Sequence, residues 1–147
     1  MRIIVQRCDK AEVRVEGNVV GKIDYGMMLL VSFTYGDTEK EIDYLVNKVL
    51  NLRIFDDENG VMNKSILDIN GEILSISQFT LYANTSKGNR PSYIDALKGE
   101  ESIKLYDMFN EKLKSKIHTE TGVFGAEMKV DFINDGPITI LLEKENK

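Results

Sequence analysis

Among its 147 residues the chain has one cysteine, one histidine, two prolines and no tryptophan. Cys8 alone cannot form an internal disulfide, and no Cys-x-x-Cys pair is present to hold zinc. His118 falls at the end of an expected helix, where a histidine is usually solvated and favoured by the helix dipole. A GxxxxGK[ST] phosphate loop, a glycine-rich dinucleotide fingerprint and an HExxH motif are also missing. We therefore expect no metal site and no cofactor.

Long apolar runs are missing as well. The longest, Met27–Phe33, has seven residues and includes Ser32, whereas a bilayer-spanning helix needs about 20. The start of the chain has only Ile3, Ile4 and Val5 in a row, too few for the apolar region of a signal peptide. These features predict a protein of a reducing compartment, the cytoplasm, with no membrane partner.

The length and the residue pattern predict a single domain over residues 1–147. Thr38 and Glu41 form a capping-box pattern, and apolar residues at helical spacing follow up to Leu50. A second amphipathic helix is expected from Glu100 to Ile117. Its buried side would carry Ile103, Tyr106, Phe109 or Asn110, Leu113 and Ile117.

Most other segments read as strands. We expect a short strand at residues 3–5, a hairpin around Gly17-Asn18, and strands at Met27–Phe33, Leu52–Phe55 and Glu72–Tyr82. Residues 128–142 read as a terminal hairpin whose turn is Asn-Asp-Gly-Pro at 134–137. Because strands outnumber helices and do not alternate with them regularly, the class is α+β.

Two polar strings stand out. In Ser77-Gln78-Phe79-Thr80-Leu81-Tyr82 the side chains of Ser77 and Thr80 either point to opposite faces, one of them solvated, or present hydroxyl and N–H groups to a pocket. Asn134-Asp135-Gly136-Pro137 is either an ordinary tight turn or a turn with a cis Gly-Pro bond. Spacing alone leaves both pairs of readings open.

Three segments carry a specific resemblance. SQFTLY (77–82), KGNRPSY (87–93) and VFGAEMKVDFINDGPIT (123–139) closely resemble the D-aminoacyl-tRNA deacylase family, first described for D-tyrosyl-tRNA. The resemblance covers the whole chain. It implies an α+β single domain in which β-sheets form a barrel-like core and two main amphipathic helices pack on it. It also implies a homodimer with its active sites at the subunit interface.

The implied activity is hydrolysis of the ester bond of D-aminoacyl-tRNA, and also of glycyl-tRNA mischarged on tRNA-Ala, with the acceptor end of tRNA as partner. Ser77, Gln78, Phe79 and Thr80 would line the catalytic pocket, and Phe124 and Met128 would pack around the terminal adenosine. Gly136 and Pro137, joined by a cis bond, would reach into the partner's pocket and reject L-amino acids sterically. Ser102 departs from the family, in which many members have alanine.

The implied reaction does not require a catalytic histidine. An aminoacyl ester is already activated, the vicinal ribose hydroxyl can assist attack, and the Thr80 N–H can stabilise the oxyanion. Thr80 as a covalent nucleophile is the alternative, although no base is in evidence to activate it. Two other function classes stay open: a non-catalytic dimeric RNA-binding module, and a hydrolase of small-molecule esters or thioesters.

The charge balance limits the RNA contact. With 24 acidic residues against 19 Lys and Arg, the net charge is −5, which excludes wrapping a long stretch of phosphates. Local basic patches are expected in the loop that holds Lys87 and Arg90, and at Lys112, Lys114 and Lys116 on the second helix. They predict modest, salt-sensitive binding of the acceptor end.

Overall fold

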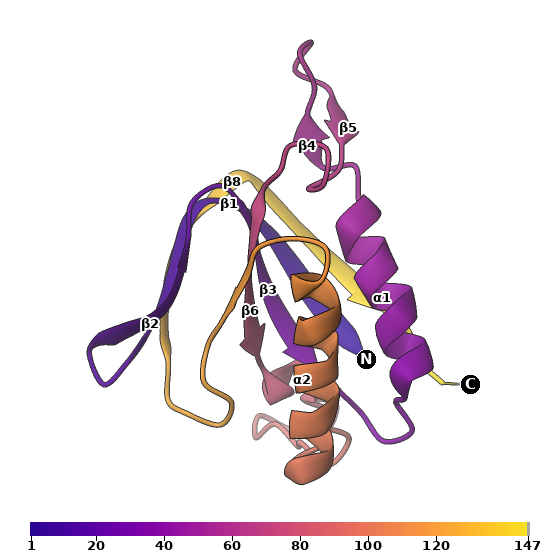
Figure 1. Cartoon of the computed structure of the whole chain (residues 1–147). Coiled ribbons are helices and arrows are strands. Elements are labelled where there is room, and N and C mark those ends of the chain that lie inside the picture. Colours follow the sequence, from indigo (N-terminus) through magenta and orange to yellow (C-terminus); the bar gives the residue numbers. More distant parts are fainter. Residues whose placement is uncertain (147) are drawn as a thin grey trace.

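The computed structural model describes residues 1–146, and within them a curved sheet is covered on one side by two helices (Figure 1). The elements in chain order are β1 (Arg2–Val15), β2 (Asn18–Ile23), β3 (Gly26–Ser32), α1 (Glu39–Asn51), β4 (Phe55–Asp56), β5 (Met62–Lys64), β6 (Glu72–Ser77), the 3₁₀ helix η1 (Phe79–Tyr82), α2 (Glu100–Lys114), β7 (Thr119–Thr121) and β8 (Lys129–Glu143). The α+β class is confirmed. Neither helix has the length and apolar character needed to cross a membrane within these residues.

Strand β1 is the spine of the sheet. Its first half pairs antiparallel with β3 and its second half with β2, while β8 runs antiparallel along the other edge of both halves. β6 then adds to β3, and β7 adds to β6, both in parallel. This arrangement brings the carboxyl ends of β3 and β6 to the same edge, where Val31 lies opposite Ser77.

The sheet nearly closes into a barrel because β2 folds over onto β6 and β7. Gly21 permits the approach: a Cβ atom there would lie 2.7 Å from the Thr121 carbonyl oxygen and 3.2 Å from Leu74 Cδ1. A small apolar cluster fills the closed side, with Cys8, Ala11, Val13, Ile23, Met28, Leu74 and Ile76 buried. The expected barrel-like core is confirmed.

Helices α1 and α2 cover the other face, as Figure 1 shows. The Thr38 capping box forms as predicted, and Ile42, Leu45 and Val49 are buried against the sheet. From α2, Phe109 and Leu113 enter the same core. The Lys112 ammonium links the helices, lying 2.9 Å from Glu39 Oε1 and 2.7 Å from Asp43 Oδ1.

The predicted strand Glu72–Tyr82 is wrong in its second half. β6 ends at Ser77, and Phe79–Tyr82 forms the 3₁₀ helix η1. The physical reason is the loss of a pairing partner. The Gln78 N–H donates to the Val31 carbonyl (2.8 Å), but β3 ends one residue later at Ser32, so the chain turns on itself through an Ala83 N–H to Thr80 carbonyl bond.

The predicted terminal hairpin is also wrong. β8 is one continuous strand: Phe132 pairs with Ala11 before the Asn-Asp-Gly-Pro segment, and Thr139 pairs with Gln6 after it, both on β1. The four residues form an irregularity at which the register shifts. Pro137 has no N–H to donate, and the Asn134 amide compensates by donating to the Arg7 and Ile138 carbonyls, each at 3.0 Å.

Smaller differences concern element ends. α2 ends at Lys114 rather than Ile117, and Ile103 is 38% exposed instead of buried. The β1–β2 hairpin is confirmed, with its turn at Glu16 and Gly17, both with positive φ. β1 is far longer than the short strand expected at residues 3–5, and the strand expected at Leu52–Phe55 begins only at Phe55.

Candidate active site

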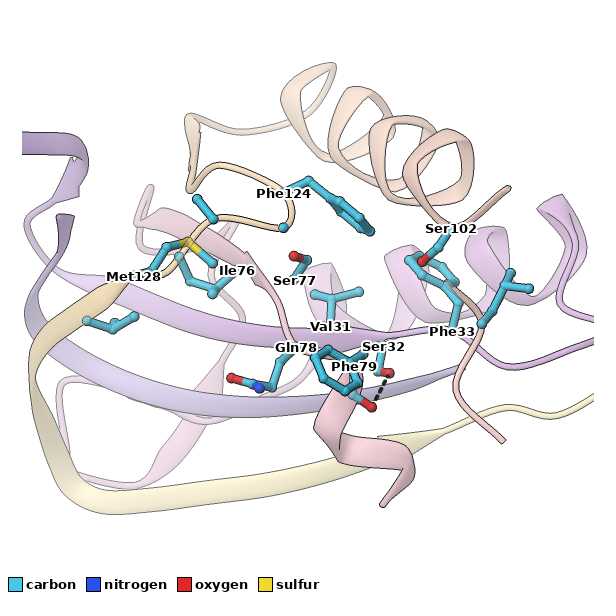
Figure 2. A pocket seen from close by; sticks show the side chains of 14 residues that line it. Val31, Ser32, Phe33, Ile76, Ser77, Gln78, Phe79, Ser102, Phe124 and Met128 are labelled. Atoms are coloured by element: carbon cyan, nitrogen blue, oxygen red, sulfur yellow. Dashed lines mark hydrogen bonds between the residues drawn. The ribbon is translucent and has the colours of Figure 1, made fainter. Parts of the chain in front are cut away.

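A cavity of about 290 Å³ opens where β3, β6 and η1 meet the start of α2 and the segment before β8 (Figure 2). Its wall combines apolar side chains with a few hydroxyl and amide groups. The lining residues are Val31, Ser32, Phe33, Ile76, Ser77, Gln78, Phe79, Leu97, Ser102, Phe124, Gly125, Ala126, Met128 and Val130. None of these side chains is ionisable, so the cavity itself supplies no acid or base.

The polar side of the cavity comes from the paired ends of β3 and β6. Ser77 and Gln78 lie at the point where the two strands separate, and Phe79 opens η1. The Ser32 hydroxyl donates to the Phe79 carbonyl at 3.4 Å and ties η1 to β3. Three of the four predicted catalytic residues therefore lie together in one wall.

Thr80, the fourth, lies next to this wall on η1 and is half-buried, but it is not among the lining residues. The Gln78 Nε2 amide donates to the Thr80 hydroxyl oxygen at 2.6 Å. That neighbour is a hydrogen-bond donor and cannot accept the hydroxyl proton as a base would.

The opposite wall holds Phe124 and Met128, the two residues predicted to pack around an adenosine. In Figure 2 Phe124 lies across the cavity from Gln78 and Phe79, with Met128 beside Ile76. The Phe124 ring packs against Tyr106, with 5.8 Å between ring centroids. An aromatic ring and a thioether facing a strand end suit a flat, apolar ligand group.

Beneath this wall, Tyr106 fixes the end of β6. Its hydroxyl donates to the Ser75 carbonyl at 2.7 Å, and burial raises the pKa of Tyr106 above its ordinary value. Ser102, the residue that departs from the family pattern, is 4% exposed and lines the cavity from the first turn of α2.

Gly136 and Pro137 are not brought to this cavity. Both are exposed, and the peptide between them is cis, as the resemblance implied. They lie on β8 beside Gln6–Cys8 of β1, which pair with the first residues of β3. None of the lining residues comes from this stretch, and on β3 the lining begins only at Val31, three residues beyond Met28.

Neither the histidine nor the cysteine lines the cavity. His118 directly precedes β7 and lies beside the start of β6, because its carbonyl accepts from the Ile73 N–H. Its Nε2 atom is 3.6 Å from Glu120 and 3.7 Å from Glu72. Cys8 is fully buried in the barrel, and burial raises the pKa of its thiol to about 12. No cluster of three metal-ligating side chains occurs in residues 1–146.

The comparisons with known proteins identify the family. A family model described as D-Tyr-tRNA(Tyr) deacylase matches residues 4–143. Curated relatives named D-aminoacyl-tRNA deacylase, from Bacillus cereus (strain B4264) and Bacillus thuringiensis (strain Al Hakam), are each 51% identical over 146 residues, 99% of this chain and 100% of theirs. The chain belongs to the D-Tyr-tRNA(Tyr) deacylase family, a family of hydrolases, which confirms the resemblance.

Two solved structures share the fold of this chain. One, titled c-Myc DNA Unwinding Element Binding Protein, is 40% identical with a TM-score of 0.94 and covers 99% of this chain and 100% of its own. The other, titled a probable eukaryotic D-amino acid tRNA deacylase, has a TM-score of 0.82 over 96% of this chain and 97% of its own. At 18% identity the second likeness concerns the fold alone.

Sequence reasoning missed the part of the wall that β3 contributes. Val31, Ser32 and Phe33 belong to a strand read simply as buried, although a serine within that apolar run was a signal. The basic patch predicted on the second helix also has less free positive charge than expected. Lys112 is held by two carboxylates of α1, and Lys114 lies 3.7 Å from Glu111.

Proposed function

We propose that the protein hydrolyses the ester bond of D-aminoacyl-tRNA, releasing the D-amino acid and tRNA, and that the terminal adenosine binds in the cavity between Ser77–Phe79 and Phe124–Met128. The observation that carries the proposal is the cavity itself: a wall with no ionisable side chain, in a chain 51% identical over its length to curated D-aminoacyl-tRNA deacylases. Such a wall suits a substrate that carries its own reactive groups.

In the proposed mechanism the protein positions the ester, and the vicinal ribose hydroxyl of the substrate assists the attack of water. Donors at the end of β6 and the start of η1, including the Thr80 N–H, stabilise the oxyanion that develops. The 2.6 Å hydrogen bond that Thr80 accepts from Gln78 supports this route over a covalent one, because no base among residues 1–146 contacts the hydroxyl.

Chiral selection is assigned to Gly136 and Pro137 of a second copy of the chain. Their exposure and their distance from the cavity of their own chain support a contribution across a dimer. β8 pairs only with β1 among the described strands and exposes Ile133 (56%) and Leu141 (59%), which supports burial of this edge. The backbone of this peptide would block the direction of an L side chain.

The same arrangement extends the proposed substrates. A D side chain would point to solvent and make few contacts with the protein, so many D-aminoacyl-tRNAs would be accepted. Glycine has no side chain to clash, which adds glycyl-tRNA, including glycine mischarged on tRNA-Ala. Lys87 and Arg90, exposed and without an ion pair among residues 1–146, would attract the acceptor end. Residence in the cytoplasm stays a prediction.

The test is a paired deacylation assay with D-Tyr-tRNA and L-Tyr-tRNA, run with the wild type and with Pro137→Ala. We expect rapid hydrolysis of the D ester only, and a smaller ratio of D to L rates in the variant. Equal rates on both esters would overturn the proofreading role. Binding without turnover would favour a non-catalytic RNA-binding module, and turnover of simple esters lacking RNA would favour a small-molecule hydrolase.

A further inference from the structure

A lysine rests on two aromatic rings at the rim of the cavity. The Lys98 ammonium lies 5.0 Å from the centroid of the Phe79 ring and 5.7 Å from that of Tyr93. The two rings meet edge to face, with centroids 5.0 Å apart and planes at 75°. Phe79 belongs to the cavity wall (Figure 2) but is 45% exposed, so this residue is also open to solvent.

The local fold holds Lys98 at this rim. Leu97, the preceding residue, lines the cavity, and its N–H donates at 2.9 Å to the carbonyl of Phe33, the residue directly after β3. Gly99 follows, and α2 starts directly after it. Lys98 is therefore the point at which the chain leaves the cavity wall for the helix.

Lys98 has no carboxylate partner in the described part of the chain. No ion pair within 4.0 Å reaches its ammonium, although Glu100 and Glu101 are close in sequence. Lys112, by contrast, is held by two carboxylates. A cation that lies over ring faces keeps its charge available and has fewer conformations to lose when it binds an anion.

The size of the cavity indicates which anion would meet this cation. At about 290 Å³ the space lies at the small end of ligand cavities, so it accommodates a group of about nucleoside size. The rest of a nucleic-acid strand must leave over the rim. The first charged group outside a bound terminal nucleoside is the phosphodiester on its 5′ side, which an ammonium at the mouth is placed to contact.

We propose that Lys98, supported by the rings of Phe79 and Tyr93, binds the phosphodiester that joins the terminal nucleoside of the substrate to the nucleotide before it. The inference rests on the proposed function and adds a second subsite to it. Lys98 acts as a positioning residue: it contacts a group that does not react, and it would improve binding of the polynucleotide without changing the hydrolytic step.

The experiment compares two substrates that differ in this phosphodiester. D-Tyr-tRNA contains it, whereas D-tyrosyl-adenosine, the aminoacylated nucleoside alone, does not. For Lys98→Gln we expect the KM for D-Tyr-tRNA to rise about fivefold at low salt with kcat unchanged. Both constants for D-tyrosyl-adenosine should match the wild type, which also verifies that the variant folds. Lys98→Arg should restore most of the affinity for the tRNA.

The matched control is Lys104→Gln, which removes the same charge from an exposed position of α2 whose ammonium contacts no ring in the described part of the chain. Salt titration gives an independent readout. Loss of one phosphate contact from a single strand should reduce the slope of log KM against log salt by about 0.7 for Lys98→Gln and leave it unchanged for the control.

Two results would overturn the proposal. One is a KM for D-Tyr-tRNA that Lys98→Gln changes no more than Lys104→Gln does. The other is an equal loss on D-tyrosyl-adenosine, which would place the effect in the nucleoside pocket. Failure of the proposed function looks different, because the wild type itself would then leave both D esters intact.

Discussion

The Arg7 Nε atom lies 3.0 Å from Oδ2 of Asp135, the residue directly before the cis Gly136–Pro137 peptide. Arg7 is only 6% exposed and also donates to the Ile54 carbonyl at 2.8 Å, so its guanidinium is fixed within the fold. The Tyr25 hydroxyl donates to the same Asp135 oxygen at 3.2 Å. A buried charge on β1 therefore holds the segment that carries the proposed chiral filter.

Replacing Asp135 by Asn should loosen this segment. Because the variant leaves the buried guanidinium of Arg7 less well compensated, we expect a loss of about 1–3 kcal/mol in the free energy of unfolding. We also expect the ratio of D to L deacylation rates to fall about tenfold, which corresponds to about 1.4 kcal/mol of discrimination. Urea unfolding and the paired D/L assay measure the two effects.

The matched control is Asp131→Asn. Asp131 lies on the same strand, is 67% exposed and approaches Arg14 only to 3.8 Å, so both quantities should stay near their wild-type values. If Asp135→Asn and Asp131→Asn behaved alike, the Arg7–Asp135 pair would have no part in selection.

Thr80 distinguishes the two hydrolytic routes. Thr80→Val removes the hydroxyl but keeps the backbone N–H and the side-chain shape. If the N–H and the substrate's ribose hydroxyl do the chemistry, kcat should fall by no more than about tenfold. A covalent route requires the hydroxyl, and its removal would cost about a thousandfold or more. Acid quenching of the wild type during turnover should recover no aminoacyl-enzyme.

The Cys8 thiol should resist alkylation in the native protein. Burial in the barrel is the main cause of its raised pKa, about 12 against an ordinary 9.0, and nearby Asp9 adds to it. Three pKa units reduce the thiolate fraction at pH 8 about a thousandfold. Iodoacetamide should therefore modify the chain only as fast as it unfolds, with one equivalent incorporated in urea. Rapid labelling of native protein would contradict this account of the barrel.

The capping box of α1 gives a pH-dependent prediction. Burial opposes the charge on Glu41, but the hydroxyl and N–H of Thr38, both 2.7 Å from Glu41 Oε2, more than offset it and lower the pKa of Glu41 below its ordinary 4.5. A lowered folded-state pKa means that the ionised carboxylate stabilises the fold above about pH 4.5 and stops doing so as the pH falls through that pKa.

Urea unfolding from pH 7 to pH 3 tests this effect. Glu41→Gln should be less stable than the wild type at pH 7, and the difference should shrink below pH 4.5. Thr38→Ala should lose about 1 kcal/mol of unfolding free energy at pH 7, while Thr38→Ser keeps the cap and most of the stability. A stability difference between Glu41→Gln and the wild type that did not change with pH would refute the assignment.

Elements specified by local pattern could be predicted from the sequence. The helix after Thr38 has its cap, its acidic first turn and its apolar spacing within 13 residues, and it forms as expected. η1 could not be predicted this way, because Phe79–Tyr82 has strand-like residues and turns only where β3 no longer offers a partner. β8 failed for the same reason. Its continuity depends on β1, more than 110 residues earlier.

The residues of the candidate site likewise divide into those set by local sequence and those brought together by long-range strand pairing. Ser77, Gln78 and Phe79 are contiguous, and their polarity at the end of a strand made a pocket wall one of two interpretations, which the family resemblance then favoured. Val31 and Ser32 join that wall only through parallel pairing of β3 with β6, a long-range contact that no local spacing encodes. The separation of Gly136 from the cavity likewise follows from the register in which β8 pairs with β1. The turn-like sequence Asn-Asp-Gly-Pro gives no indication of that register.

The continuity of β8 determines which active site of the proposed dimer a substitution would affect. Met128, just before this strand, lines the cavity of its own chain. Gly136, eight residues further on, begins the peptide that in the proposed dimer closes the cavity of the neighbouring chain. A chain with a defective Pro137 would then keep its own site selective and leave its neighbour's site without a filter. In a mixed dimer with a Ser77-defective chain, one site would hold both faults and the other neither. The selectivity of each site would therefore depend on both chains of the dimer and not on one chain alone.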